Sequence, residues 1–115
     1  MIRRNIFSGY MAPEYITNGR YSAKADIFSY GVILLEILSG LRNDSSYSDV
    51  EAENLLSYAW GLWNEGNHLK LADSALESDF SRDEVERCIH IGLLCVQKDS
   101  AKRPDIASVL LMLNA

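Results

Sequence analysis

The feature that most constrains this sequence is a long apolar stretch from Asp26 to Leu38. On a helix, where successive side chains are about 100° apart, its apolar residues lie on nearly every side, and Ser29 and Glu36 share the remaining arc. A helix that is apolar nearly all round is a buried helix. The stretch is too short to span a bilayer, which takes about 20 apolar residues. We therefore expect residues 23–39 to form the central helix of a soluble helical domain.

The residues on either side of this stretch favour a helix over a strand. Ser22 is suited to cap the first turn, and Gly40 lies where the helix would end. The alternative is a buried strand through Val32 to Leu35, but the length of the apolar run and the two caps count against it.

A second, amphipathic helix is expected over 52–65, with Trp60 and Trp63 on its apolar face. These two rings could form a partner-binding surface, although packing in the core is the simpler interpretation. Residues 67–80 show no clear period and are expected to be mostly irregular. Residues 42–49 form a polar loop that is best read as a solvated surface loop, although it could be phosphorylated at its serines (Ser45, Ser46 and Ser48).

Two more helices are expected towards the end of the chain, which makes the predicted fold all-α. Ser81 and Glu84 have the spacing of a capping box, which begins a helix that runs to about Gln97. His90 falls on the polar side of that helix and is predicted to be a surface residue. The last helix is expected over 104–114, and four of its side chains are predicted to point inward: Ile106, Val109, Leu110 and Leu113.

Length and charge exclude several classes of protein. A chain of 115 residues is one domain or a piece of one. Its formal net charge of −5 argues against binding to nucleic acid, which depends on clustered Lys and Arg. We find no secretory signal and no transmembrane run, so we expect a cytoplasmic chain that makes no membrane contact of its own.

The cysteines and histidines indicate neither a disulfide nor a metal site. Cys88 and Cys95 lie on one predicted helix with Cα atoms about 10 Å apart, which is too far for a disulfide. They are most simply buried thiols in a reducing compartment. His68 and His90 supply no metal-ligand spacing.

The residues by themselves indicate no enzyme site. The sequence contains no glycine-rich phosphate loop and no Ser/His/Asp arrangement. Four charged residues look structural instead: Glu14, Lys24, Asp26 and Arg103. Asp26, at the start of the apolar helix, is expected to be buried and to accept hydrogen bonds from the backbone of a neighbouring loop. The alternative is that it only complements its own helix N-terminus, and spacing alone does not decide.

Three motifs in order resemble the C-terminal part of a protein kinase catalytic domain: Ala12-Pro13-Glu14, the segment from Lys24 to Gly31, and Arg103-Pro104. The resemblance extends from about Gly9 to Leu113. Residues 53–60 and 87–97 further resemble plant receptor-like kinases of the cysteine-rich and S-domain lectin type. Members of that group are Ser/Thr kinases whose kinase domain lies on the cytoplasmic side of a single membrane span.

The resemblance implies roles for individual residues. Glu14 matches the glutamate of the Ala-Pro-Glu motif, and Arg103 matches its buried ion-pair partner. Asp26 matches the aspartate that holds the backbone of the catalytic loop. The substrate-facing loop is matched by six consecutive residues: Gly9, Tyr10, Met11, Ala12, Pro13 and Glu14.

The resemblance also implies what these residues lack. The family uses ATP and Mg²⁺ to phosphorylate protein substrates, but the residues needed for phosphoryl transfer are not among these 115. We therefore expect no cofactor in this chain and no catalysis. The segment Ile6-Phe7-Ser8 departs from the Gly-Thr pattern of the family, so residues 1–8 are expected to be atypical and 9–114 to be the kinase part.

Two consequences follow for the chain. Its alternative function is that of a helical interaction module or decoy, which would bind kinase partners or substrates. In addition, the central helix of the family packs against segments that are not in this sequence. Part of its apolar surface should then face water, which predicts a marginally stable, aggregation-prone chain.

Overall fold

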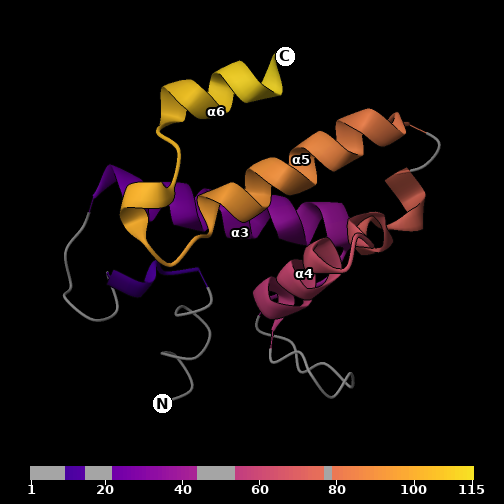
Figure 1. The fold of residues 1–115 in the computed structure, drawn as a ribbon, viewed down its shortest axis with the longest axis horizontal. Helices are drawn as coiled ribbons and strands as arrows, with labels where there is room; N and C mark the ends of the chain where they lie inside the picture. Colours follow the sequence, from indigo (N-terminus) through magenta and orange to yellow (C-terminus); the bar gives the residue numbers. More distant parts are fainter. Residues whose placement is uncertain (1–9, 15–21, 44–53, 77–78) are drawn as a thin grey trace.

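The structure, a computed structural model, describes residues 10–14, 22–43, 54–76 and 79–115. Within these ranges every regular element is a helix (Figure 1). The all-α fold predicted from the sequence is therefore confirmed. Gly9, the start of the expected substrate loop, and the serines of the polar loop (Ser45, Ser46 and Ser48) lie outside the described residues.

Helix α3 (Ala23–Ser39) has the bounds that the sequence predicts. The side chain of Ser22 accepts a hydrogen bond from the backbone N–H of Ala25, which satisfies one of the free donors of the first turn. At the other end Gly40 adopts a left-handed conformation, with φ of 72°, and its N–H donates to the carbonyl of Glu36. Glycine adopts this conformation at no steric cost, which is why the helix ends there.

Helix α5 (Arg82–Cys95) packs along α3, and the two helices form the centre of the molecule (Figure 1). Two glycines set their separation. A Cβ atom on Gly31 would lie 2.6 Å from Cβ of Cys95, and one on Gly92 would lie 2.8 Å from Cδ2 of Leu35. Both distances are far below van der Waals contact, so larger residues at these positions would force α3 and α5 apart.

The predicted start of α5 is confirmed, because Ser81 and Glu84 form both hydrogen bonds of the capping box. Its end was predicted two residues too late: the helix stops at Cys95, and Val96 is its C-cap. His90 is exposed, as expected for the polar side of this helix.

Helix α4 (Leu55–Asn64) packs against the core through Leu55 and Ala59, which are almost fully buried. Of its predicted range, residues 52–53 lie outside the described part of the chain, and the helix ends at Asn64. The segment that follows was expected to be mostly irregular. It contains two short 3-10 helices, η1 (His68–Leu71) and η2 (Ser74–Leu76), which lead to α5.

The last helix corrects the sequence analysis. After a 3-10 turn, η3 (Ser100–Lys102), helix α6 runs over Ile106–Leu113, and Asp105 rather than Pro104 precedes it as the N-cap. Of the four side chains predicted to point inward, only Val109 is buried, and three are exposed: Ile106, Leu110 and Leu113. The reason is that α6 packs on α5 through one narrow side, where Val109 meets the buried Ile91 and Cys95.

One side of α3 also differs from the prediction of a buried helix. The side chains of Ile33 and Ile37 are 47% and 66% exposed, so the expected contact of part of the central helix with water is present. Asp26 lies on the same side, because residues seven and eleven apart share a helix face. It is exposed, and the expectation that its carboxylate is buried was wrong. The physical reason is that α5 packs on the opposite side of α3.

Candidate functional site

The described part of the predicted substrate loop is joined to the helices by an ion pair between Glu14 and Arg103. The guanidinium donates two hydrogen bonds to the carboxylate, with Nη1–Oε2 of 2.8 Å and Nη2–Oε1 of 2.9 Å. The Arg103 side chain is fully buried, whereas that of Glu14 is 24% exposed. This bidentate geometry is the strongest form of ion pair available to arginine, because the attraction between the charges adds to two well-directed hydrogen bonds.

Arg103 has further partners on all sides. Its Nε donates to the carbonyl of Gln97 at 2.7 Å, and its Nη1 donates to the carbonyl of Lys24 at 3.0 Å. The Lys24 ammonium in turn donates to the carbonyl of Arg103. The guanidinium also lies over the ring of Phe28, 5.0 Å from its centroid. One side chain therefore joins the loop, the first turn of α3 and the connection that follows α5.

The environment of Glu14 favours its ionised form. The hydrogen bonds from Arg103 are the main cause of a pKa below the ordinary value of 4.5, and they outweigh the partial burial, which acts in the opposite direction. The carboxylate is therefore charged at neutral pH, and the buried guanidinium has a permanent counter-ion.

A second anchor holds Tyr10 through two residues of α3 that the sequence analysis did not single out as functional. The Ser29 hydroxyl donates to the carbonyl of Tyr10, and the phenol of Tyr10 donates to the Glu36 carboxylate at 2.8 Å. Glu36 also accepts from the backbone N–H of Asn43 at 2.9 Å. The signal was present in the sequence, since Ser29 and Glu36 are the polar residues that interrupt the apolar surface of this helix.

The other described residues of the predicted loop lie between these two anchors. Ala12 is buried in the core, and Met11 and Pro13 are half-buried. The structure thus brings Glu14 and Arg103 together and fixes the loop on α3. It places Asp26 elsewhere, on the exposed side of α3.

The described residues contain no group of three or more His, Cys, Asp or Glu side chains that could hold a metal ion. Trp63 lies between the two histidines, with its ring centroid 4.4 Å from that of His68 and 5.0 Å from that of His90.

The thiols of Cys88 and Cys95 are both free. The thiol of Cys95 is fully buried, and burial raises its pKa to about 11. Burial also raises the pKa of the half-buried Cys88 thiol, so neither group is activated as a nucleophile at neutral pH.

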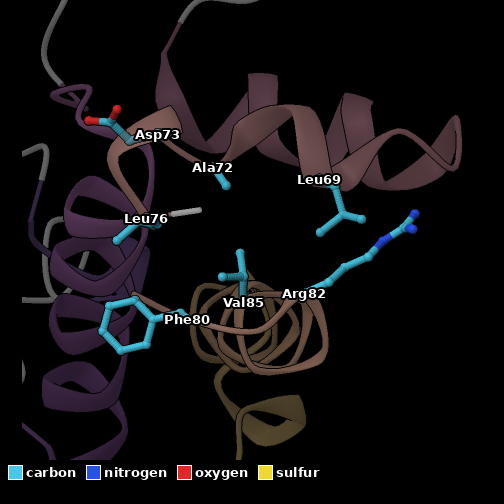
Figure 2. Close-up of a pocket in the computed structure, with 7 residues that line it drawn as sticks. All are labelled: Leu69, Ala72, Asp73, Leu76, Phe80, Arg82 and Val85. Carbon is cyan, nitrogen blue, oxygen red and sulfur yellow. The ribbon is translucent and has the colours of Figure 1, made fainter. Parts of the chain in front are cut away.

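A small cavity of about 300 Å³ lies at the N-terminal end of α5 (Figure 2). Leu69, Ala72 and Val85 face one another across it, and Leu76 and Phe80 also line it. The charged ends of Asp73 and Arg82 point away from the cavity in opposite directions (Figure 2). A binding site needs a few polar groups to orient its ligand, so this apolar cavity does not identify one.

The chain is similar to known protein kinases. Residues 3–113 match the family described as protein tyrosine and serine/threonine kinase. The chain is 52% identical over 107 residues to cysteine-rich receptor-like protein kinase 10 of Arabidopsis thaliana. It is 50% identical over 107 residues to the G-type lectin S-receptor-like serine/threonine-protein kinase SD1-13 of the same plant. Each alignment covers 93% of this chain, which spans 16% and 13% of the two relatives.

A solved structure shares the fold. The pseudokinase domain of BIR2, described as an immune regulator of the RLK/Pelle family, superposes with a TM-score of 0.79 at 26% identity. The match covers 92% of this chain and 32% of that one. Among the helices described here, none is long and apolar enough to cross a membrane. The family match, the close relatives and the shared fold lead to one conclusion: this chain belongs to the protein tyrosine and serine/threonine kinase family.

Proposed function

We propose that these residues are the helical, substrate-positioning part of the kinase domain of a receptor-like Ser/Thr kinase. The observation that carries the proposal is the bidentate ion pair between Glu14 and Arg103, since it holds the loop that would face a protein substrate. The contacts of Tyr10 with Ser29 and Glu36 support it, because they fix the other end of the described loop on the rigid helix α3.

We further propose that these 115 residues by themselves do not transfer phosphate. Phosphoryl transfer needs a phosphate-binding loop, an ion-paired lysine and carboxylates that hold Mg²⁺. The sequence contains no such loop, and the described residues offer no acidic cluster for the metal. ATP and Mg²⁺ are cofactors of the family, but the residues present do not fit them.

The test is an assay of the pure chain with radiolabelled ATP, Mg²⁺ and a generic acceptor protein. We expect no incorporation above that of a blank without the chain. Reproducible transfer, in proportion to the amount of chain, would overturn this part of the proposal.

Asp26 has a separate role in the proposal. By resemblance it would hold the catalytic loop of an intact kinase domain. Its position supports this, because it shares the exposed side of α3 with Ile33 and Ile37, a surface that a further segment could cover. In a complete kinase domain of this type, Asp26→Asn should lower kcat without loss of the fold. An unchanged kcat would remove this role.

We also propose that this part of the protein lies in the cytoplasm. It is supported by the relatives, which are receptor-like kinases. By resemblance the kinase domain of such a receptor lies on the cytoplasmic side of the membrane.

A second function, binding of kinase partners without catalysis, is favoured by the same exposed side of α3. Ile33 and Ile37 are large apolar side chains in water, one helical turn apart. The description of BIR2 as a pseudokinase domain and an immune regulator supports a non-catalytic role for this fold. The test is a pull-down of purified cysteine-rich receptor-like protein kinase 10 by the chain. Retention should be lost in Ile37→Lys, and no retention above a scrambled control would end this hypothesis.

A further inference from the structure

A groove of about 680 Å³ lies on the other side of α3 from Ile33 and Ile37. Phe28 and Val96 are almost fully buried and form its floor. Leu56 and Trp60 of α4 are half-buried and present apolar surface to it, and Pro13 of the substrate loop lies at its edge. The groove is large enough for one bulky apolar side chain with its flanking backbone, within the usual range of about 300–1,000 Å³ for ligand sites.

The rim of this groove is cationic. Lys98 and Lys102 line it, both are exposed, and neither ammonium forms an ion pair with another described residue. Asp99 lies between them in the sequence, but its carboxylate accepts a hydrogen bond from the backbone N–H of Ala101 and caps η3. Among the described residues that line the groove, the charged side chains therefore sum to one positive charge, on a chain whose net charge is −5. A local charge of opposite sign to the whole chain favours an anionic ligand at this place.

The first turn of α4 lines another part of the groove. Its N-cap, Asn54, and the exposed Ser57 belong to the lining, but the N–H groups of Leu56 and Ser57 already donate to the side chains of Asn43 and Asn54, so the preference for an anion rests on the two lysines. The Phe28 ring of the floor is also in contact with the guanidinium of Arg103, whose Cζ lies 5.0 Å from the ring centroid.

We propose that this groove binds an acidic peptide segment of a protein partner, with one large apolar side chain against Trp60 and carboxylates beside Lys98 and Lys102. An uncharged apolar ligand would make no favourable electrostatic interaction with Lys98 and Lys102. A nucleic acid would be repelled by the net charge of −5. The proposal does not rest on phosphoryl transfer, and the groove lies apart from the exposed side of α3, so each proposal can fail alone.

The test measures binding of a fluorescein-labelled peptide of Glu, Asp and one central Phe by fluorescence anisotropy. Two control peptides replace the acidic residues by Lys, or the Phe by Ala. We expect the acidic peptide to bind and both controls to bind at least about fivefold more weakly. Higher salt should weaken the binding of the acidic peptide, because the lysines are exposed. This series needs no change in the chain, so it does not depend on the folding of a variant.

Two charge reversals locate the site. Lys102→Glu should raise the Kd for the acidic peptide at least about fivefold, whereas Lys70→Glu, an equal change of charge on η1 outside the groove, should change it by less than about twofold. Equal weakening by both variants would show a general charge effect and overturn the proposal. So would the absence of binding at about 1 mM peptide, tighter binding of a DNA duplex, or self-association of the chain that Lys102→Glu abolishes.

Discussion

Replacement of Arg103 by Met tests the central ion pair most directly. Methionine fills a similar volume with an apolar, flexible chain, so the variant removes the charge without opening a large cavity. The guanidinium makes five hydrogen bonds: two to Glu14 and one each to the carbonyls of Lys24, Gln97 and Lys98. The variant leaves these acceptors without their donor, in a place where the Arg103 side chain had excluded water.

The expected magnitude follows from burial. Loss of one partner of a buried pair costs about 3–5 kcal/mol. Because Glu14 keeps some contact with water, we expect the lower end, about 3 kcal/mol of unfolding free energy. A chain of 115 residues has a total stability on the order of 6–17 kcal/mol. The variant should therefore lose a large share of its stability, and a marginal chain would be close to unfolding.

Urea unfolding followed by far-UV circular dichroism measures this loss. Lys102→Met, which removes an exposed charge one residue away, should change the unfolding free energy by less than about 0.5 kcal/mol. A double-mutant cycle with Glu14→Gln should give a coupling of about 2 kcal/mol or more. A loss below about 1 kcal/mol for Arg103→Met, or strictly additive effects in the cycle, would refute the reasoning.

Three further predictions concern packing, reactivity and pH. Gly31→Ala should lower the unfolding free energy by about 1–3 kcal/mol, because its Cβ would overlap Cys95. In the control Gly61→Ala the added Cβ has no neighbouring atom within 4 Å, so this variant should be neutral or stabilising. Equal effects of the two variants in thermal melts would contradict this prediction. Iodoacetamide should modify Cys88 well before Cys95, because the thiol of Cys95 is fully buried and has a pKa of about 11. Mass spectrometry of the peptides measures the rate of modification at each cysteine. Equal rates in the native chain would count against the fold. Because the pKa of Glu14 is lowered in the folded state, its contribution to stability is complete above about pH 5 and is lost as the pH falls through the folded pKa. The loss of stability as the pH falls below about 5 in urea titrations should be smaller in Glu14→Gln, and an unchanged pH profile would contradict the lowered pKa.

Much of the fold could be predicted from local patterns. The bounds of α3 follow from Ser22, the apolar run and Gly40, which act within a few residues of one another. The capping box at Ser81 and Glu84 is local in the same way. The end of α5 and the inward side of α6 were predicted less well. Those features depend on which neighbour a helix meets, and periodicity does not identify the neighbour.

The candidate site shows the same division. Motif order brought Glu14 and Arg103 to attention, but the hydrogen bonds between them join residues 89 positions apart and appear only in the folded chain. Ser29 and Glu36 were visible as polar interruptions of an apolar helix. Their partner, Tyr10, was not, because nothing in the sequence states which loop returns to that helix.

By itself, the sequence determined the approximate positions of the α-helices, the caps of α3, the start of α5 and the kinase family, because propensity, capping and motif spacing are properties of neighbouring residues and their order. Only the tertiary structure decided which surfaces are buried: that Gly31 and Gly92 let α3 and α5 approach, that Asp26 and Ile37 face water, and that Trp60 and two lysines form one groove. The physical reason is that burial and charge pairing depend on distances between segments far apart in the chain, and those distances are set by packing of the whole domain.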